Sequence, residues 1–380
     1  MYDAIVIGGG VVGSSTAYHL VCEGAKTLLI DREDLGRATN AGAGILSPQT
    51  YYNENTDAWF NFAVEAVAYY PTLVEQLHNE QAGVNTYGRC GKLLVAIDKD
   101  EIEAFERAKD RIFGRQKRRG LPAPDELYEI SSREARQLFP ALAPVYGAIY
   151  YHNAARVDAR LLSQALRRAG KERGLVIKRA SAERLLIQHG SVTGAVVDGT
   201  PIMADKVAIS GGAWSSQFGE QLNVHIPIKP QRGQIIHLSL PGTDTTNWPI
   251  VSSFHGHYIL PWPDSRIAIG ATREYGSGFE AILTAEGMQE VLTEALRVAP
   301  GLAKAQIQQM RVGLRPLTSD KSPVLGRVPE IENIYLVTGH GATGLQAGPY
   351  SGKVIAELMV GKEDGPDISA FNVTRFAAPY

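Results

Sequence analysis

Three glycines near the start of the chain have the spacing Gly8-x-Gly10-x-x-Gly13, a pattern that can bind the phosphates of a dinucleotide. Gly8 would permit a tight turn, Gly10 would let the backbone approach a pyrophosphate, and Gly13 would let a helix pack closely on a strand. Asp31, eighteen residues after the last glycine, can accept hydrogen bonds from the ribose hydroxyls of an adenosine. An acid at this position argues against a 2′-phosphate, although the neighbouring Arg32 keeps that alternative open. The motif alone is compatible with NAD and with FAD.

The residues around these glycines predict the order of strand, turn and helix that the motif requires. Residues 3–7 form a short apolar run, residues 14–23 have helical apolar spacing, and residues 27–30 form a second strand that ends on Asp31. The free N–H groups and the positive end of the helix would then face the phosphates. A glycine-rich turn that binds nothing is the weaker alternative, because the strand, the helix and the terminal acid are all present.

Further runs of small residues could let the backbone approach a ligand. The first is Ala38-Thr39-Asn40-Ala41-Gly42-Ala43-Gly44-Ile45. A packed core does not require such a run, so we expect a second cofactor contact there. The second is the glycine loop 339–348, between an expected strand at 334–338 and an expected helix at 350–360. The third is 211–214, which follows a buried strand as at the carboxyl edge of a parallel sheet.

The middle of the chain indicates a second kind of sheet. Residues 235–240, 258–261 and 266–271 are expected strands, and a helix at 284–298 would cover them. Asp158 precedes a helical pattern, and a role as its N-cap is favoured over a catalytic role. We therefore predict an α/β chain with a Rossmann-type cofactor domain and a mixed or antiparallel β-sheet substrate domain covered by helices. The cofactor domain would comprise residues 1–85, 146–222 and 313–380, and the substrate domain residues 86–145 and 223–312.

Composition and charge exclude several classes of function. With 380 residues, 44% of them hydrophobic and 21% charged, the chain has the composition of a two-domain globular protein. The formal net charge of −2 gives no electrostatic reason to expect nucleic acid or an anionic membrane as a partner. Two cysteines, Cys22 and Cys90, cannot form a disulfide framework, and the sequence has no Cys or His cluster that indicates a metal. Without a long apolar run or a leader pattern, the expectation is a cytoplasmic protein with no integral membrane segment.

Six motifs in a fixed order resemble those of one enzyme family. They are Gly8-x-Gly10-x-x-Gly13, Ala38-Thr39 with Ala43-Gly44-Ile45, Gly212-Ala213-Trp214, Pro230-x-Arg232-Gly233-Gln234, Gly313-Leu314-Arg315-Pro316, and Gly339-His340-Gly341 with Gly344-Leu345. The chain resembles, over nearly its whole length, the flavin-dependent oxidoreductases of the D-amino acid oxidase family, which include glycine oxidase, sarcosine oxidase-like and D-amino acid dehydrogenase enzymes. The resemblance implies FAD as the cofactor. It would be held non-covalently, because relatives that attach flavin use a late cysteine and none follows Cys90 here.

The resemblance also assigns cofactor roles to individual residues. The glycine turn would hold the pyrophosphate, Asp31 the adenosine ribose, and the loop from Gly339 to Gln346 would bring N–H groups to the flavin. Glu183 falls where a backbone contact to the adenine side is usual, although relatives often carry a small apolar residue there. The implied cofactor-binding residues are Gly8, Gly10, Val11, Val12, Gly13, Asp31, Arg32, Ala38, Thr39, Ala43, Gly44, Ile45, Glu183, Gly212, Trp214, Gly339, Gly341, Ala342, Thr343, Gly344, Leu345 and Gln346.

The same resemblance implies a substrate site. Arg315 would anchor a carboxylate, because a guanidinium can grip it with two parallel hydrogen bonds. Tyr258 matches a substrate-contacting tyrosine, and a half-buried structural tyrosine is the equal alternative. Two residues depart from the family pattern: Arg273 stands where glycine oxidase-like relatives tend to carry an apolar residue, and Ala342 where some relatives place a substrate-facing arginine. The resemblance therefore implies a changed substrate. Arg273 would either extend the site for an anionic substrate or pair with Glu274. His340 would shape the loop rather than act as a base.

The expected reaction is the FAD-dependent oxidation of the C–N bond of an amino acid, N-methylated amino acid or imino acid to an imine. Electrons would pass to oxygen or to another acceptor, and the sequence does not decide between an oxidase and a dehydrogenase. A flavoprotein subunit of a larger electron-transfer complex is the second hypothesis, and an NAD-dependent enzyme is the third. A homo-oligomer or a hetero-oligomeric complex is compatible with either flavoprotein hypothesis.

Overall fold

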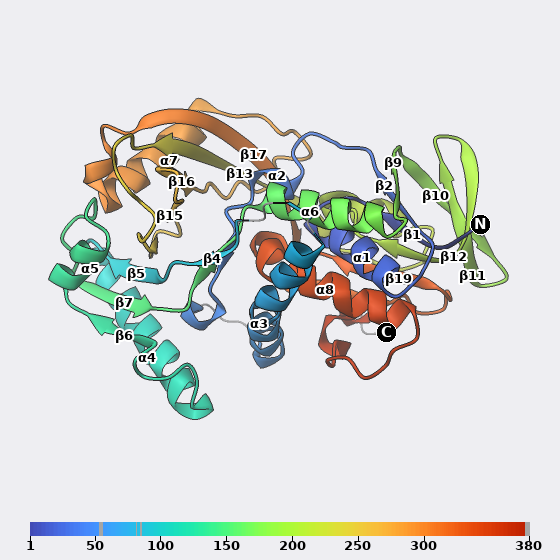
Figure 1. The fold of residues 1–380 in the computed structure, drawn as a ribbon, viewed down its shortest axis with the longest axis horizontal. Helices are drawn as coiled ribbons and strands as arrows, with labels where there is room; N and C mark the ends of the chain where they lie inside the picture. The colour runs from blue at the N-terminus through green and yellow to red at the C-terminus, as the bar shows by residue number, and fades with distance from the viewer. Residues whose placement is uncertain (53–55, 81, 84–85, 377–380) are drawn as a thin grey trace.

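The computed structural model describes residues 1–52, 56–80, 82–83 and 86–376, and it contains two large β-sheets with helices around and between them. The two sheets lie at opposite ends of an elongated molecule (Figure 1). The predicted domain boundary at residue 85 lies outside the described residues. None of the helices within the described ranges is long and apolar enough to cross a membrane.

The first sheet has the parallel centre that the glycine motif requires. β1 (Tyr2–Ile7) lies between β2 (Thr27–Asp31) and β12 (Thr200–Ile209) and runs parallel to both. The remaining strands of this sheet are β9 (Val176–Arg179), β10 (Ala182–Gln188), β11 (Ser191–Val197), β18 (Val324–Arg327) and β19 (Ile334–Thr338). The central strands are buried on both faces, which explains their near-continuous apolar sequences.

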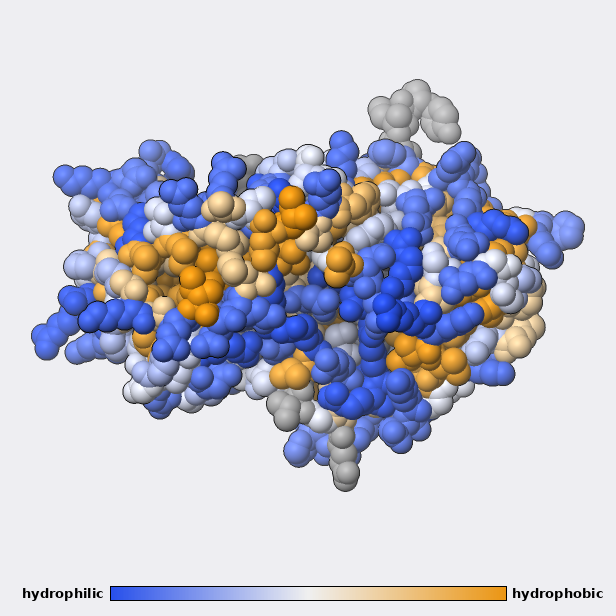
Figure 2. Space-filling view, turned by 90° about the horizontal axis from the view of Figure 1, so that it is seen from above, coloured by the Kyte–Doolittle hydropathy of each residue, from blue (hydrophilic) through white to orange (hydrophobic). Residues whose placement is uncertain are grey.

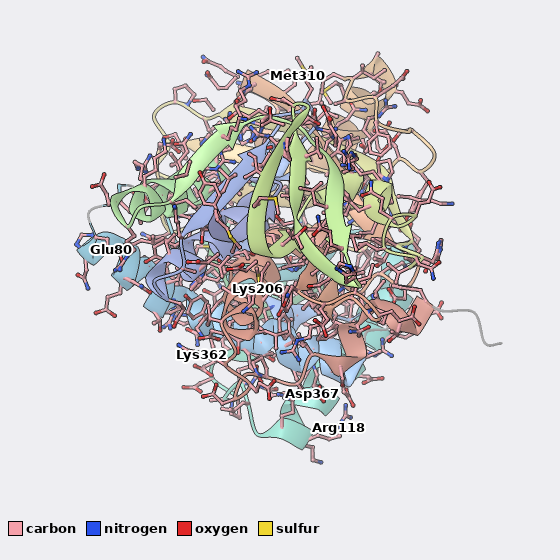
Figure 3. The ribbon with its side chains drawn as sticks, turned by 90° about the vertical axis from the view of Figure 1, so that its right-hand side faces the viewer. Glu80, Arg118, Lys206, Met310, Lys362 and Asp367 are labelled. Atoms are coloured by element: carbon pink, nitrogen blue, oxygen red, sulfur yellow. The ribbon has the colours of Figure 1, made fainter. Side chains whose placement is uncertain are left out.

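The two faces of this sheet are covered differently. Ile5 and Ile7 of β1 pack toward a core that includes residues of β10 and β11, whereas Ala4 and Val6 pack toward a core closed by helices. Those helices are α1 (Val11–Cys22), α3 (Asp57–Asn79) and α8 (Gly344–Met359), and α6 (Ala159–Glu172) packs beside α1. Figure 3 shows the ribbon of β10 to β12 in front, where Lys206 donates a hydrogen bond to the Met359 carbonyl at the end of α8.

The second sheet is antiparallel apart from one parallel pair, β14 with β5, as predicted for a mixed sheet. Its strands, in spatial order, are β17 (Gln306–Thr318), β13 (Ile228–Ser239), β16 (Arg266–Gly270), β15 (Tyr258–Pro261), β14 (Ile250–Ser253), β5 (Lys92–Ala96), β7 (Gly147–Tyr151) and β6 (Leu127–Ile130). Helices α7 (Ala285–Val298), α4 (Ile102–Arg119) and α5 (Ser132–Leu138) pack on it. A small sheet of β3 (Ile45–Leu46), β8 (Ala155–Arg156) and β4 (Gly88–Arg89) joins the two large ones.

A predicted element boundary differs in the structure, and Pro349 and Pro316 each lie within a regular element. The glycine loop ends at Thr343, and α8 begins at Gly344, so half of the expected loop is helix. Pro349 is tolerated inside this helix because the Tyr70 hydroxyl donates to the Leu345 carbonyl, the group that a Pro349 N–H would have bonded. β17 continues through Pro316, because it is an edge strand and the missing proline N–H leaves no partner unsatisfied.

Other predictions of local structure are confirmed. Asp158 is an N-cap, since its carboxylate accepts hydrogen bonds from the N–H groups of Arg160 (3.0 Å) and Leu161 (3.2 Å). The division into two domains stays a proposal, and strand pairing by itself places β7 and all of β17 with the second sheet. Apolar side chains gather on the face seen from above (Figure 2), and the exposed Met310 of β17 lies on this side (Figure 3).

Candidate active site

One cavity of about 550 Å³ is lined by residues from both large sheets, and it brings together most of the predicted site residues. On its lining are Gly8, Gly10, Val11, Val12, Asp31, Arg32, Ala38, Thr39, Ala43, Gly44, Ile45, Gly212, Trp214, Tyr258, Arg273, Arg315, Gly341, Ala342, Thr343, Gly344, Leu345 and Gln346. Gly13, Gly339 and Glu183 are not on the lining. Glu183 turns its side chain to solvent on β10, and its neighbour Ala182 lines the cavity instead, because successive strand residues face opposite sides.

The first glycine turn leaves no room for side chains. Gly8 has a φ of +100°, and a Cβ there would lie 2.5 Å from the Ser210 carbonyl oxygen. A Cβ on Gly13 would lie 1.8 Å from the Gly8 carbonyl oxygen, so helix α1 can pack on the turn only with glycine at this position. Gly10 precedes α1, and the Val11 N–H at the start of the helix donates to the Thr39 hydroxyl (3.0 Å).

Asp31 is held in place by two arginines. Its Oδ2 accepts hydrogen bonds from Arg37 (2.6 Å) and Arg167 (2.9 Å), and Arg167 also donates to the Gly9 carbonyl. Arg32, which had kept a 2′-phosphate possible, pairs with Asp34 (2.8 Å). Sequence reasoning missed Arg167, because it lies on α6 within no motif and meets Asp31 only through the fold.

The small-residue run serves packing as well as the cavity. The expectation that no packed core requires this run is wrong at two positions. A Cβ on Gly44, whose φ is +84°, would lie 1.8 Å from the Val157 carbonyl oxygen, and a Cβ on Gly42 would lie 2.5 Å from Leu345. These glycines let the segment pass between β8 and the start of α8 while its backbone still lines the cavity.

The late loop contributes His340 and Gln346. His340 is buried, its Nε2 shares a hydrogen bond with the Ser351 hydroxyl (2.9 Å), and burial lowers its pKa to about 4. It is therefore neutral near pH 7, which agrees with a structural rather than a basic role. Gln346, in the first turn of α8, accepts a hydrogen bond from the Ser47 N–H (3.2 Å), and its side chain also interacts with Tyr51.

Arg315 reaches the cavity from the middle of β17. Its Nη1 donates to the Thr272 carbonyl (2.9 Å) and to Gln231 Oε1 (3.2 Å), and within the described residues the rest of the guanidinium forms no hydrogen bond or ion pair. Burial lowers the pKa of Arg315, and the charge of Arg273 lowers it further. Burial raises the pKa of Tyr258 to about 12, so this tyrosine is a neutral phenol beside two cations.

Lys92 is a second residue that sequence reasoning missed. It lies on β5, it is buried on the cavity lining, and its Nζ donates to the Thr50 hydroxyl (3.0 Å). Burial lowers its pKa to about 8. A lysine within an otherwise apolar strand was the signal available in the sequence.

The cavity has the features that FAD requires. Helices α1 and α8 both begin on its lining without an acid in the first turn, so two positive helix ends are available to phosphates or to flavin oxygens. Arg37 Nε is a buried donor without a partner in the described ranges, and Arg37 lies on the cavity lining, where a bound cofactor would offer an acceptor. The residues present therefore fit the cofactor, and their individual contacts with it stay predictions.

Comparison with known proteins identifies the family. Residues 3–358 match the DAO family model, described as FAD dependent oxidoreductase. The chain is 36% identical to the uncharacterized oxidoreductase YurR of Bacillus subtilis (strain 168), with 98% of each chain covered. It is 30% identical to the glycine oxidase of Pseudomonas aeruginosa, over 94% of this chain and 95% of the relative.

A solved structure supports the same assignment. The crystal structure of iminodiacetate oxidase from Chelativorans sp. BNC1 has a TM-score of 0.91 and 36% identity, over 97% of this chain and 98% of that one. The family model and that crystal structure both match nearly the whole chain, including residues of both sheets and of the glycine-lined cavity. The chain therefore belongs to the DAO family of FAD-dependent oxidoreductases.

Proposed function

We propose that this chain oxidises the C–N bond of an amino acid or N-substituted amino acid whose carboxylate is held by Arg315. The observation that carries the proposal is the guanidinium of Arg315, which lies half-buried on the cavity lining with no acidic partner among the described residues. A partly desolvated cation without a counter-ion is costly, and a substrate carboxylate would neutralise it with bidentate hydrogen bonds.

The surrounding residues orient such a substrate. Gln231 and the Thr272 carbonyl fix the Nη1 of Arg315, which leaves its other nitrogens to bind the carboxylate. Tyr258 offers a neutral hydroxyl, because its pKa of about 12 keeps the proton on the oxygen. FAD, when bound, would supply the acceptor for the hydride that leaves the carbon bearing the nitrogen. Water would hydrolyse the imine product to a carbonyl compound and an amine.

No protein base is required by this proposal. His340 is neutral and engaged by Ser351, and Tyr258 does not ionise near neutral pH. The amine must therefore arrive unprotonated or lose its proton to water before the hydride leaves. The names of the similar glycine oxidase and iminodiacetate oxidase support a small α-amino carboxylate as the substrate.

The test is to incubate the flavin-loaded protein with glycine, N-methylglycine, proline and both enantiomers of alanine. Formation of the matching carbonyl compound and amine supports the proposal. Hydrogen peroxide formed in air identifies an oxidase, whereas turnover only with an added artificial acceptor identifies a dehydrogenase or a subunit of an electron-transfer complex. Absence of product from every amine, for a protein whose flavin is reduced by dithionite, would refute the proposal.

A further inference from the structure

The strand register places Arg315 and Arg273 on one face of the second sheet. Arg315 of β17 lies opposite Gln231 of β13. On the other side of β13, Arg232 pairs with Glu274 and the Thr272 N–H donates to the Gln234 carbonyl, so Arg273 lies opposite Gly233. Positions 231 and 233 point to the same face, and both arginines therefore face the cavity.

Gly233 leaves the space that brings the two arginines together. A Cβ at Gly233 would lie 2.4 Å from Nη2 of Arg315, so the Arg315 guanidinium lies across the backbone of β13. Its Nη1 reaches the Thr272 carbonyl, which is directly before Arg273 in the chain. The Cα atoms of the two arginines are about 12 Å apart, since they are separated by two strand spacings across the sheet and two residues along it. The Arg315 guanidinium crosses β13 and so covers much of that distance.

Arg273 has no acidic partner within the described residues. Its neighbour Glu274 points to the opposite face, where its carboxylate accepts hydrogen bonds from Arg232 (2.7 Å), Gln234 (2.7 Å) and Thr272 (2.6 Å). The alternative that Arg273 pairs with Glu274 is therefore excluded. Arg273 is instead exposed at the cavity, with its Nη1 beside Gly256.

The substrate end of the cavity is consequently cationic. Arg315 and Arg273 both lie on this part of the lining, on one face of the second sheet. The acids on the described lining are Asp31 and Asp34, which pair with arginines around the β2 end. One carboxylate would neutralise Arg315 and leave Arg273 without a counter-ion.

We propose that Arg273 binds a second carboxylate and that the preferred substrate is an amine with two carboxylates, one for each arginine. The inference rests on the proposed function for the carboxylate at Arg315. The two carboxylates are joined through a short spacer, because the Arg315 guanidinium already reaches the carbonyl of Thr272, the residue directly before Arg273. The second carboxylate belongs either to a substituent on the nitrogen or to the side chain of an α-amino acid, and the two sources are separable by experiment.

The experiment compares matched substrates in three flavin-loaded proteins: the wild type, Arg273→Leu and the control Arg311→Leu. Arg311 lies on β17 like Arg315 but is not on the cavity lining. N-methylglycine is compared with iminodiacetate, which carries its second carboxylate on the nitrogen substituent. Alanine is compared with aspartate, which carries its second carboxylate on the side chain. The dissociation constants of the unreactive pair (methylthio)acetate and thiodiacetate are measured by the change in flavin absorbance.

In the wild type, the dicarboxylate of at least one substrate pair should have a kcat/KM about tenfold or more above its monocarboxylate. Arg273→Leu should remove this preference, because its kcat/KM for the dicarboxylate should fall about tenfold or more further than its kcat/KM for the monocarboxylate, and Arg311→Leu should leave the preference unchanged. Thiodiacetate should lose affinity in Arg273→Leu in the same proportion, relative to (methylthio)acetate.

Two results would overturn the inference: a wild type without preference for either dicarboxylate, or a preference that survives Arg273→Leu. Oxidation of monocarboxylates with no role for Arg273 would leave the proposed function standing. If no amine is oxidised, the proposed function fails, and the ratio of the two thioether affinities still decides whether Arg273 binds a second carboxylate.

Discussion

Replacement of Arg315 gives the most informative prediction for substrate binding. Arg315→Leu removes the guanidinium that we assign to the substrate carboxylate, and Arg315→Lys keeps the charge but loses the planar pair of donors. Removal of one partner from a buried, hydrogen-bonded charge pair costs about 2–5 kcal/mol. We therefore expect kcat/KM to fall by a factor of about 30 to 5,000 in Arg315→Leu and by about tenfold in Arg315→Lys.

The structure also predicts what Arg315→Leu does to stability. The Thr272 carbonyl and Gln231 lose the donor that Nη1 now supplies, which costs about 1–3 kcal/mol, and removal of a cation without a counter-ion offsets part of this cost. The free energy of unfolding should therefore fall by less than about 3 kcal/mol. Flavin content should be unchanged, because Arg315 lies in the second sheet whereas the glycine turn and Asp31 belong to the first.

The assay is rapid mixing of the flavin-loaded protein with amino acid under anaerobic conditions, which separates the substrate dissociation constant from the rate of flavin reduction. Arg311→Leu, on the same strand but off the cavity, is the matched control and should behave as the wild type. A fully flavin-loaded Arg315→Leu protein with wild-type affinity and rate would refute the role of Arg315.

Three further predictions concern the cavity walls. Gly13→Ala would place a Cβ 1.8 Å from a carbonyl oxygen of the glycine turn and should lower the affinity for FAD, measured by reconstitution, more than about tenfold. The control is Gly114→Ala in α4, where the new Cβ would lie 3.6 Å from the nearest atom and should leave stability unchanged or slightly higher. Arg167→Ala should weaken FAD binding by about tenfold, because it removes a contact that orients Asp31, the residue that we expect to bind the ribose. Arg168→Ala, which removes the hydrogen bond from the Arg168 side chain to the Ala82 carbonyl, should leave FAD affinity unchanged; equal effects of the two substitutions would contradict the assignment. Burial lowers the pKa of Lys92 from 10.5 to about 8, so between these pH values the unfolded chain binds a proton that the folded chain has lost. The folded state is therefore destabilised by the charge on Lys92, fully below pH 8 and not at all above pH 10.5. Lys92→Met should therefore raise the free energy of unfolding at pH 7 by on the order of 3 kcal/mol, with the gain fading as the pH rises to 10.5 in urea denaturation; a gain independent of pH would show that charge burial is not the cause.

Local sequence was sufficient where local interactions decide the structure. The first strand, glycine turn and helix follow from apolar periodicity and from the glycines that a close turn requires, and Asp158 is an N-cap because its side chain meets the next N–H groups in the chain. The cofactor and the family followed from motif order. These features depend on residues near one another in sequence.

The remaining features depend on contacts between distant residues. Helix α8 begins early because Tyr70 bonds a carbonyl that Pro349 cannot, and these residues are far apart in the chain. Arg167 meets Asp31 only after α6 packs beside α1, and Lys92 meets Thr50 although 42 positions separate them in the chain. The position of Arg273 relative to Glu274 depends on the pairing register of β13, which a single sequence does not specify.

The most direct test of the account is an anaerobic titration of the flavin-loaded protein with an α-amino carboxylate, followed by flavin absorbance and product analysis. The account predicts that one equivalent of substrate bleaches one equivalent of flavin and yields one equivalent each of the carbonyl compound and the amine. The esterified substrate, which lacks the carboxylate for Arg315, should bleach the flavin far more slowly. Equal bleaching by acid and ester, or no bleaching by any amino acid, would contradict the central claim.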